Sequence, residues 1–183
     1  MSTSDGVRPD SLIRKTDGRR YWEAATADLD GMLGGIPAVF SPISRVDLQG
    51  SRTFLSRLGP PPRRSIGRVT EGLLSRVALQ IDVVEPVAKF VEVLRRRPRV
   101  RRVFPVGLED WSPAAGDGTR YDLVWMQWVL VHLTDEQVVG YLERCRDALV
   151  RGDDKAVIVV KENVSTSGRD EFDSVDSTVT RPG

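Results

Sequence analysis

The apolar positions of this chain fall into short runs that alternate with helical patterns. The runs are rich in β-branched and aromatic residues, and the last is apolar throughout, as strands buried on both faces are. Strands that alternate with helices along a sequence form a parallel sheet with helices on both of its faces. We therefore predict an α/β fold with four strands near 79–84, 103–106, 121–126 and 156–160.

Helical spacing is clearest where a cap precedes it. The segment Thr134-Asp-Glu-Gln137 has the capping-box pattern and predicts a helix that continues through Leu149. Other helical patterns cover 19–33, 44–58, 66–78 and the segment that Pro86 opens. Residues 1–18 are polar, so we predict a disordered tail there and one domain over 19–183. The polar segment 165–183 shows no periodicity.

Composition narrows the classes of protein to which the chain can belong. It has 183 residues, a net charge of +1 and no apolar run long enough to cross a membrane. The arginine-rich run 95–102 is compatible with a nucleic-acid patch, but we interpret it as a solvated helix end. One cysteine, Cys145, and one histidine, His132, offer neither a disulfide nor a metal cluster. We expect a soluble protein of the cytoplasm and also the nucleus, without a nucleic-acid or membrane partner.

Polar residues follow the predicted strands, at the edge where open parallel sheets bind ligands. Glu85 follows the first of these strands, where an acid can accept hydrogen bonds from ribose hydroxyls or, equally, cap the next helix. Gly67 and Arg68 begin a predicted helix, whose backbone amides can face an anion. Trp128 and His132 lie beyond the third predicted strand. Side chains of these two types are more often packed in a core than used in chemistry.

Several motifs, in their order along the chain, resemble the eukaryotic α-N-methyltransferases that modify proteins beginning Xaa-Pro-Lys. The most specific are the loop GMLGG at 31–35 and the stretch WMQWVLVHLTD at 125–135. Shorter matches lie at 51–55, 66–68, 107–108, 161–163 and 175–178. The resemblance covers roughly residues 20–181. It implies a class I, Rossmann-like methyltransferase fold and S-adenosylmethionine as the methyl donor.

The resemblance implies a cofactor site on the matching positions. Glu85 stands where the family's usual aspartate holds the ribose, Arg68 lies near the methionine carboxylate, and Leu108 and Glu109 flank the adenine. Other positions line a channel shared by the cofactor and the substrate. The whole implied cofactor set is Gly67, Arg68, Glu85, Leu108, Glu109, Gln127, Met32 and Trp22.

The same resemblance implies a site for a peptide N-terminus. Asp176 and His132 are the implied acid–base pair, and the substrate-binding residues are Trp128, Asn163, Asp173 and Thr178, the last standing where serine is common. An α-amino group has a pKa near ~8, so a base that removes its proton raises the reactive population at neutral pH. The acidic bias of 161–176 suits a lysine-containing peptide, and a solvated polar loop is the alternative.

Two segments of the family pattern are not matched. Where the family has a hydrophobic strand ending in an Asp-x-Gly-x-Gly loop, this chain has PPPRR at 60–64. We therefore expect the first strand and most of the glycine loop to be missing, because consecutive prolines supply no backbone donors to a sheet. The chain also stops before the family's final antiparallel strands. We expect weak cofactor binding and impaired activity, and the alternatives are a non-catalytic peptide-binding remnant and a nucleic-acid methyltransferase.

Overall fold

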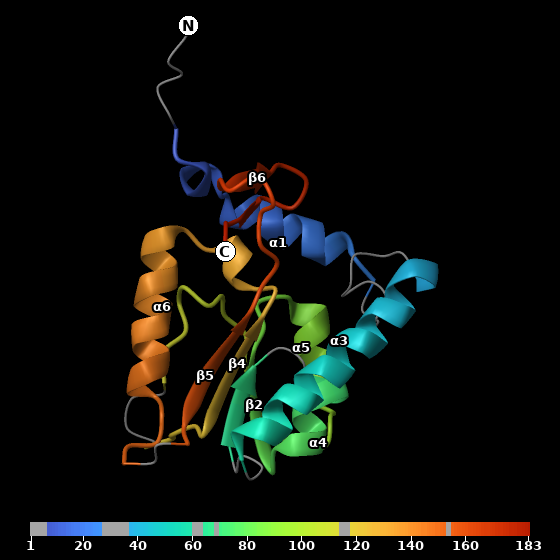
Figure 1. Cartoon of the computed structure of the whole chain (residues 1–183), viewed down its shortest axis with the longest axis vertical. Helices are drawn as coiled ribbons and strands as arrows, with labels where there is room; N and C mark the ends of the chain where they lie inside the picture. The colour runs from blue at the N-terminus through green and yellow to red at the C-terminus, as the bar shows by residue number, and fades with distance from the viewer. Residues whose placement is uncertain (1–6, 27–36, 60–63, 68–69, 114–117, 153–154) are drawn as a thin grey trace, which may run out of the picture.

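The fold is built on five parallel strands in the order β3-β2-β1-β4-β5 (Figure 1). The computed structural model describes residues 7–26, 37–59, 64–67, 70–113, 118–152 and 155–183. The strands of this sheet are β1 Arg64–Gly67, β2 Gln80–Val84, β3 Val100–Phe104, β4 Leu123–Gln127 and β5 Val157–Lys161. The predicted parallel α/β sheet is therefore confirmed, with the four expected strands within a few residues of their predicted positions.

The first strand, which the sequence analysis expected to be missing, is present as β1. It occupies the middle of the sheet and pairs with β2 and β4, so that Ile66 stands opposite Asp82 on one side and Val124 on the other. The three prolines end at Pro62, and the four residues of β1, Arg64–Gly67, all have the amide donors that a central strand needs. The predicted helix over 66–78 is therefore wrong at its start, because residues 66 and 67 belong to β1. A π-helical turn, η2 Thr70–Leu74, and the short helix α4 Ser75–Val77 form only its second half.

The strand β4, which lies between β1 and β5, has core residues on both of its faces. Leu123 and Trp125 pack in a cluster with residues of α3, η2 and α5, whereas Val124 and Met126 pack toward α6. Because all five residues of β4 are buried, the strand reads as a continuous apolar run. Figure 1 shows α3 and α5 beside one face of the sheet and α6 beside the other. The helices are α3 Pro37–Leu58, α5 Ala88–Leu94 and α6 Asp135–Asp147.

Helix α6 begins and packs as its sequence predicts. The Thr134 side chain accepts from the Gln137 amide, and the Gln137 side chain accepts from the Thr134 amide, which completes the capping box. Cys145 faces inward and is fully buried. Burial raises the pKa of its thiol to about 12, so this cysteine is a core residue and not a nucleophile. No helix of the described residues is long and apolar enough to span a membrane.

The two ends of the chain meet above the carboxyl edge of the sheet (Figure 1). A 3-10 turn, η1 Pro9–Leu12, and helix α1 Lys15–Ala24 lie next to a small antiparallel sheet of β6 Glu171–Asp173 and β7 Thr178–Thr180. Residues 1–6 lie outside the described part of the chain, but from Pro9 onward the expected disordered tail is wrong. The aperiodic segment 165–183 likewise contains two strands, which are separate from the main sheet.

A network of ion pairs joins these two ends to the start of α6. The Arg8 guanidinium donates to both Asp10 and Asp135, and Arg181 donates to Asp135 from the other side. The buried Asp10 carboxylate also accepts from the Asp135 amide at 3.0 Å. That backbone hydrogen bond, together with the positive charge of Arg8, lowers the pKa of Asp10.

The Asp10 network predicts a pH-dependent contribution to stability. A carboxyl whose pKa is lower in the folded state stabilises the fold above its ordinary value of 3.8, and the contribution is lost as the pH falls through the folded pKa. At neutral pH, Asp10→Asn should lower the free energy of unfolding by about 1 kcal/mol. Urea unfolding of both proteins between pH 7 and pH 3 should show this difference shrinking below about pH 4. A difference that is constant over the whole range contradicts the assignment.

Candidate active site

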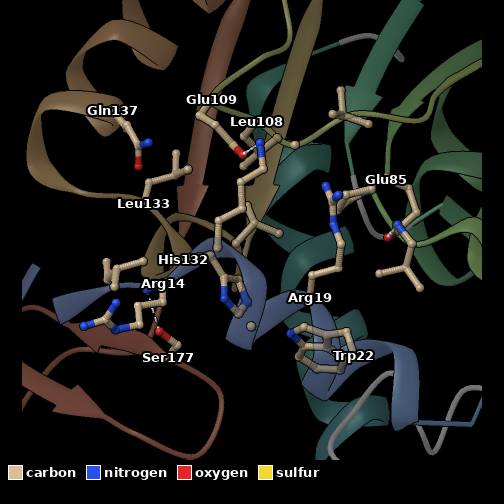
Figure 2. Close-up of a pocket in the computed structure, with 18 of the residues that line it drawn as sticks. Arg14, Arg19, Trp22, Glu85, Leu108, Glu109, His132, Leu133, Gln137 and Ser177 are labelled. Atoms are coloured by element: carbon tan, nitrogen blue, oxygen red, sulfur yellow. Dashed lines mark hydrogen bonds and ion pairs between the residues drawn. The ribbon is translucent and has the colours of Figure 1, made fainter. Parts of the chain in front are cut away.

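A cleft of about 210 Å³ opens at the carboxyl edge of the sheet (Figure 2). Its walls come from α1, from the segments that follow β2, β3 and β4, and from Ser177 in the β6–β7 turn. The strand order reverses between β1 and β4, because β2 and β3 continue to one side and β5 to the other. Open parallel sheets bind their ligands at such a reversal, beyond the carboxyl ends of the strands.

One half of the cleft combines apolar walls with an acid. Glu85 follows β2, and its amide donates to Phe104 O at 3.0 Å, which fixes the residue at the end of the strand. Its Oε1 accepts from the Val87 amide at 2.8 Å, so this carboxylate also caps the segment before α5. Val87, Phe90 and Leu108 supply apolar surface beside it. An acid next to an apolar slot suits a nucleoside, which presents hydroxyls and a flat base.

The loop after β3 comes very close to itself in this half. A Cβ atom on Gly107 would lie 2.3 Å from Glu109 Oε2, so the flexible end of the Glu109 side chain would have to shift to make room for it. Lys15 of α1 reaches across to this loop, and its Nζ lies 2.5 Å from both Glu109 Oε1 and Asp110 Oδ2. The hydrogen bonds to Asp110 and Glu109 raise the pKa of Lys15, and the pKa of Asp110 is lowered in turn. Glu109 therefore lies in the cleft as part of an ion-paired cluster.

The other half of the cleft contains two residues with strained backbones. Trp128 has a φ of 53° and Ser177 a φ of 57°, in the left-handed region that residues with side chains rarely adopt. The Trp128 amide donates to Lys161 O, and the Ser177 hydroxyl accepts from the Arg14 amide at 2.7 Å. Strain of this kind costs of order 1–3 kcal/mol and gathers at functional sites. Both residues line the cleft.

His132 lies at the centre of this half. It ends a short 3-10 turn, η3 Leu130–His132, whose start is held by Glu162, because Oε1 of Glu162 accepts from the Val129 and Leu130 amides. Trp22 of α1 meets the imidazole edge-on, with ring centroids 6.2 Å apart. Figure 2 shows His132 between α1 and the strand ends, and its ring faces the cleft.

Gly18 brings the β6–β7 turn against this group. A Cβ atom on Gly18 would lie 3.0 Å from Asp176 O and 3.7 Å from His132 Nδ1. The Asp176 carboxylate accepts from the Thr178 hydroxyl at 2.6 Å, which holds it within the turn. Gly18 thus lies beside His132 and beside the backbone carbonyl of Asp176, whereas the Asp176 side chain is not among the described residues that line the cleft.

The structure gathers some of the implied site residues and separates others. Six of them line the cleft: Trp22, Glu85, Leu108, Glu109, Trp128 and His132. Gln127 does not line it, because its side chain is buried between Trp125 Nε1 and the Asp47 carboxylate of α3. Asn163 and Asp173 are exposed, and the Asp173 carboxylate accepts from its own turn at the Val175 amide. Gly67 ends β1, whereas Met32 and Arg68 lie outside the described residues.

Sequence reasoning missed the contribution of the N-terminal helix. Four residues of this region line the cleft: Arg14, Lys15, Gly18 and Arg19. The first three fell in the predicted disordered tail, and Arg19 was only the start of a predicted helix. Figure 2 shows Arg19 extending from α1 into the cleft, toward the side on which Glu85 lies. Ser177 was also missed. The sequence of α1 is polar and carries no motif, and although Ser177 lies in the matched stretch 175–178, the resemblance gave it no role.

The fold and the position of the cleft define a class I methyltransferase. A solved structure of a SAM-dependent methyltransferase from Leishmania major matches the chain with a TM-score of 0.76 and 29% identity. The match covers 91% of this chain and 67% of that one.

Sequence comparison narrows the class to one family. A family model described as "AdoMet dependent proline di-methyltransferase" matches residues 10–183, and the chain therefore belongs to that family. The alpha N-terminal protein methyltransferase 1 of Schizosaccharomyces pombe is 41% identical over 91% of this chain and 78% of its own length. The N-terminal Xaa-Pro-Lys N-methyltransferase 1 of Danio rerio is 35% identical over 91% and 77%.

The residues in the cleft fit the cofactor of this family, S-adenosylmethionine. Glu85 and the apolar residues beside it suit its nucleoside. The expectation of weak cofactor binding rested on the missing amides of the glycine loop that follows the first strand. The lost strand is corrected by β1, while the segment 68–69 that follows it lies outside the described residues. Weak cofactor binding, which depends on the glycine loop, therefore stays a prediction.

Gly18 provides a test of how closely α1 must approach the β6–β7 turn. We expect Gly18→Val to lower kcat/KM for methyl transfer by about 10-fold, because its side chain must push α1 away from Asp176 O and displace the residues that α1 presents. Steady-state kinetics at fixed cofactor concentration measures this. The matched control is Gly50→Val in α3, where an added Cβ meets nothing within 4 Å. Equal losses in the two variants contradict a specific role for Gly18.

Proposed function

We propose that this protein transfers methyl groups from S-adenosylmethionine to the α-amino group of proteins that begin Xaa-Pro-Lys. The observation that carries the proposal is the composition of the cleft, which joins an acid-and-apolar half, around Glu85, to a half that contains His132 and Trp128. The names of the curated relatives, at 35–41% identity, support the same substrate class.

The nucleoside half is proposed to bind the cofactor. Glu85 follows β2, where its carboxylate can accept hydrogen bonds from ribose hydroxyls. Leu108 and Phe90 offer apolar surface for the adenine. Bound there, the cofactor supplies a methyl group on a positively charged sulfur as the electrophile.

The other half is proposed to bind the peptide. The indole of Trp128 offers a flat face for the proline ring or for a cationic centre. The exposed acids of the adjoining segment, among them Asp173 and Glu171, attract a peptide that carries a lysine at its third position. We assign Asp176 and His132 to the terminal amine, because His132 lines the cleft and Asp176 is the neighbour of Ser177, which also lines it.

The proposed chemistry of these two residues is proton removal. An α-amino group with a pKa near ~8 is mostly protonated at neutral pH, and only the neutral form has a lone pair to donate. The Asp176 carboxylate accepts the ammonium proton, and the Thr178 hydroxyl that donates to its Oδ1 keeps it oriented. His132, which Trp22 contacts edge-on, is positioned to pass that proton to solvent.

A direct assay tests the proposal. The purified chain is mixed with S-adenosylmethionine and a peptide beginning Xaa-Pro-Lys, and methylation is followed by mass spectrometry. Three controls run in parallel: the same peptide with an acetylated N-terminus, the same peptide with alanine in place of proline, and a short RNA. We expect methyl groups on the free Xaa-Pro-Lys peptide and none on the acetylated one.

Each other outcome identifies a different function. Methylation of the RNA but not of the peptide contradicts the proposed substrate class. Calorimetry that detects peptide binding without cofactor binding supports the peptide-binding remnant. Equal methylation of the acetylated and free peptides shows that a side chain, and not the α-amine, is the acceptor.

A further inference from the structure

Helix α1 covers the cleft but contributes little to the core. Of its ten residues only Gly18 is buried, while Tyr21 and Trp22 are half-buried and Lys15, Arg20 and Glu23 are exposed. Burial of apolar side chains is the usual reason that a helix stays on a protein surface. The polar contacts at its two ends therefore have a large share in holding α1 in place.

The first of these contacts lies near the start of the helix. Lys15 Nζ contacts Glu109 Oε1 and Asp110 Oδ2, both at 2.5 Å, in the loop after β3. Glu109 is only 16% exposed at its side chain, so the pair is partly shielded from solvent. Lys15 of α1 and Glu109 of the loop after β3 both line the cleft, so this contact joins two of its walls.

The second contact lies at the other end of the helix, and here the lysine belongs to the body of the protein and the acceptors belong to α1. Lys89 of α5 donates from Nζ to Glu23 O at 2.8 Å and also to Ala25 O. Backbone carbonyls at the end of a helix lack partners within the helix and carry a partial negative charge, so a cation stabilises them. Two lysines, one on the helix and one on the body of the protein, thus hold the two ends of α1.

We propose that α1 is a lid over the cofactor half of the cleft, and that Lys15 and Lys89 are positioning residues that keep it closed. The hinge of this lid is the η1 end, where the Arg14 amide is bound to Ser177 and Asp10 is bound to the start of α6. Cofactor enters and leaves when the two lysine contacts open. The part of the inference that concerns cofactor exchange rests on the proposed function, whereas the lid itself does not.

The lid predicts a dependence on ionic strength. Raising the salt concentration from about 0.1 M to about 1 M shortens the screening distance from about 10 Å to about 3 Å. The Lys15 pair then weakens, while an apolar contact does not. Opening of α1 should therefore become more frequent in high salt, and this response should be smaller once Lys15 is removed.

Hydrogen exchange of the unliganded protein tests the lid. In Lys15→Met and in Lys89→Met the amides of 15–24 should exchange about two- to five-fold faster than in the wild type, the range that loss of one partly exposed ion pair gives. The matched control is Arg20→Met, on the same helix, where an 81% exposed side chain pairs with Asp17 one turn away. Amides of α6 should be unchanged in all variants, which shows that the variants are folded. Lys15→Arg should restore the wild-type rate.

Dissociation of S-adenosylhomocysteine, followed by stopped-flow fluorescence, tests the link to the cofactor. The dissociation rate should rise in the two lysine variants by about the same two- to five-fold factor, and not in Arg20→Met. If 15–24 exchange equally in all three variants, the lid is refuted. If exchange rises but dissociation does not, α1 does not control the cofactor. If S-adenosylhomocysteine binds neither the wild type nor any variant, the proposed function fails, and with it the control of cofactor release by α1. The hydrogen exchange of α1 still decides whether the lid exists.

Discussion

Asp176→Asn is expected to lower the rate of methylation of an Xaa-Pro-Lys peptide by about 10²- to 10⁴-fold, the usual contribution of a general base. Asparagine keeps the size of the side chain and its acceptor oxygen for the Thr178 hydroxyl, so the turn should fold unchanged. It cannot take a proton from the substrate, and it no longer attracts the cationic amine. Steady-state kinetics should therefore show a large fall in kcat with a smaller rise in KM.

The control for this prediction is Asp170→Asn, an acid of the same segment that has no implied role in the site. It should keep nearly full activity. His132→Ala is expected to have a smaller effect than Asp176→Asn, because water can replace an imidazole that already faces the cleft. If Asp170→Asn loses as much activity as Asp176→Asn, or if neither variant loses any, then the segment is a solvated acidic loop and Asp176 is not the base.

Asp82→Ala is expected to lower the free energy of unfolding by about 2–4 kcal/mol. Asp82 is 1% exposed in β2, and its carboxylate accepts from Arg101 Nε at 3.0 Å and from the Tyr121 hydroxyl at 2.8 Å. Removing it leaves a guanidinium and a hydroxyl without their acceptor in the interior. The figure lies below the usual loss for a fully buried pair because Arg101 is 26% exposed. Denaturant unfolding followed by circular dichroism measures it.

The control for Asp82 is Asp147→Ala, which removes an ion pair of two exposed side chains. Surface pairs contribute about 0–1 kcal/mol, so this variant should unfold nearly as the wild type does. A loss of less than about 1 kcal/mol for Asp82→Ala contradicts the view that the pair is essential. The prediction also gives one arginine of the run 95–102 a structural role, since the partly buried Arg101 pairs with the buried Asp82.

Strands and helices whose patterns are local could be predicted well from the sequence. The buried strand β4 is apolar on both faces, and α6 starts with a complete capping box, so each carries its own signal. The strand β1 carries none, because it is four residues long and follows three prolines. Its pairing with β2 and β4 on both sides decides its conformation, and that information lies in distant parts of the chain.

The candidate site divides in the same way. Glu85, Leu108 and His132 could be placed because each follows a strand, and the carboxyl ends of parallel strands meet at one edge. The residues of α1 could not, because their helix is polar and is held by contacts to residues far along the sequence. Gln127 is the last residue of its strand, β4, but its side chain turns into the core to meet Asp47, and only packing decides between the core and the cleft.

The joining of the two chain ends has a consequence for the order in which the protein folds. The Arg14 amide and the Ser177 hydroxyl are 163 residues apart in sequence, and Arg8 and Asp135 are 127 apart. During synthesis the N-terminal residues leave the ribosome first, but they have no binding surface until residues near the C-terminus have followed. The parallel sheet can assemble before that point, whereas α1 cannot dock. The wall of the cleft that α1 supplies is therefore completed late, so a nascent chain cannot form the whole site before Ser177 has been made.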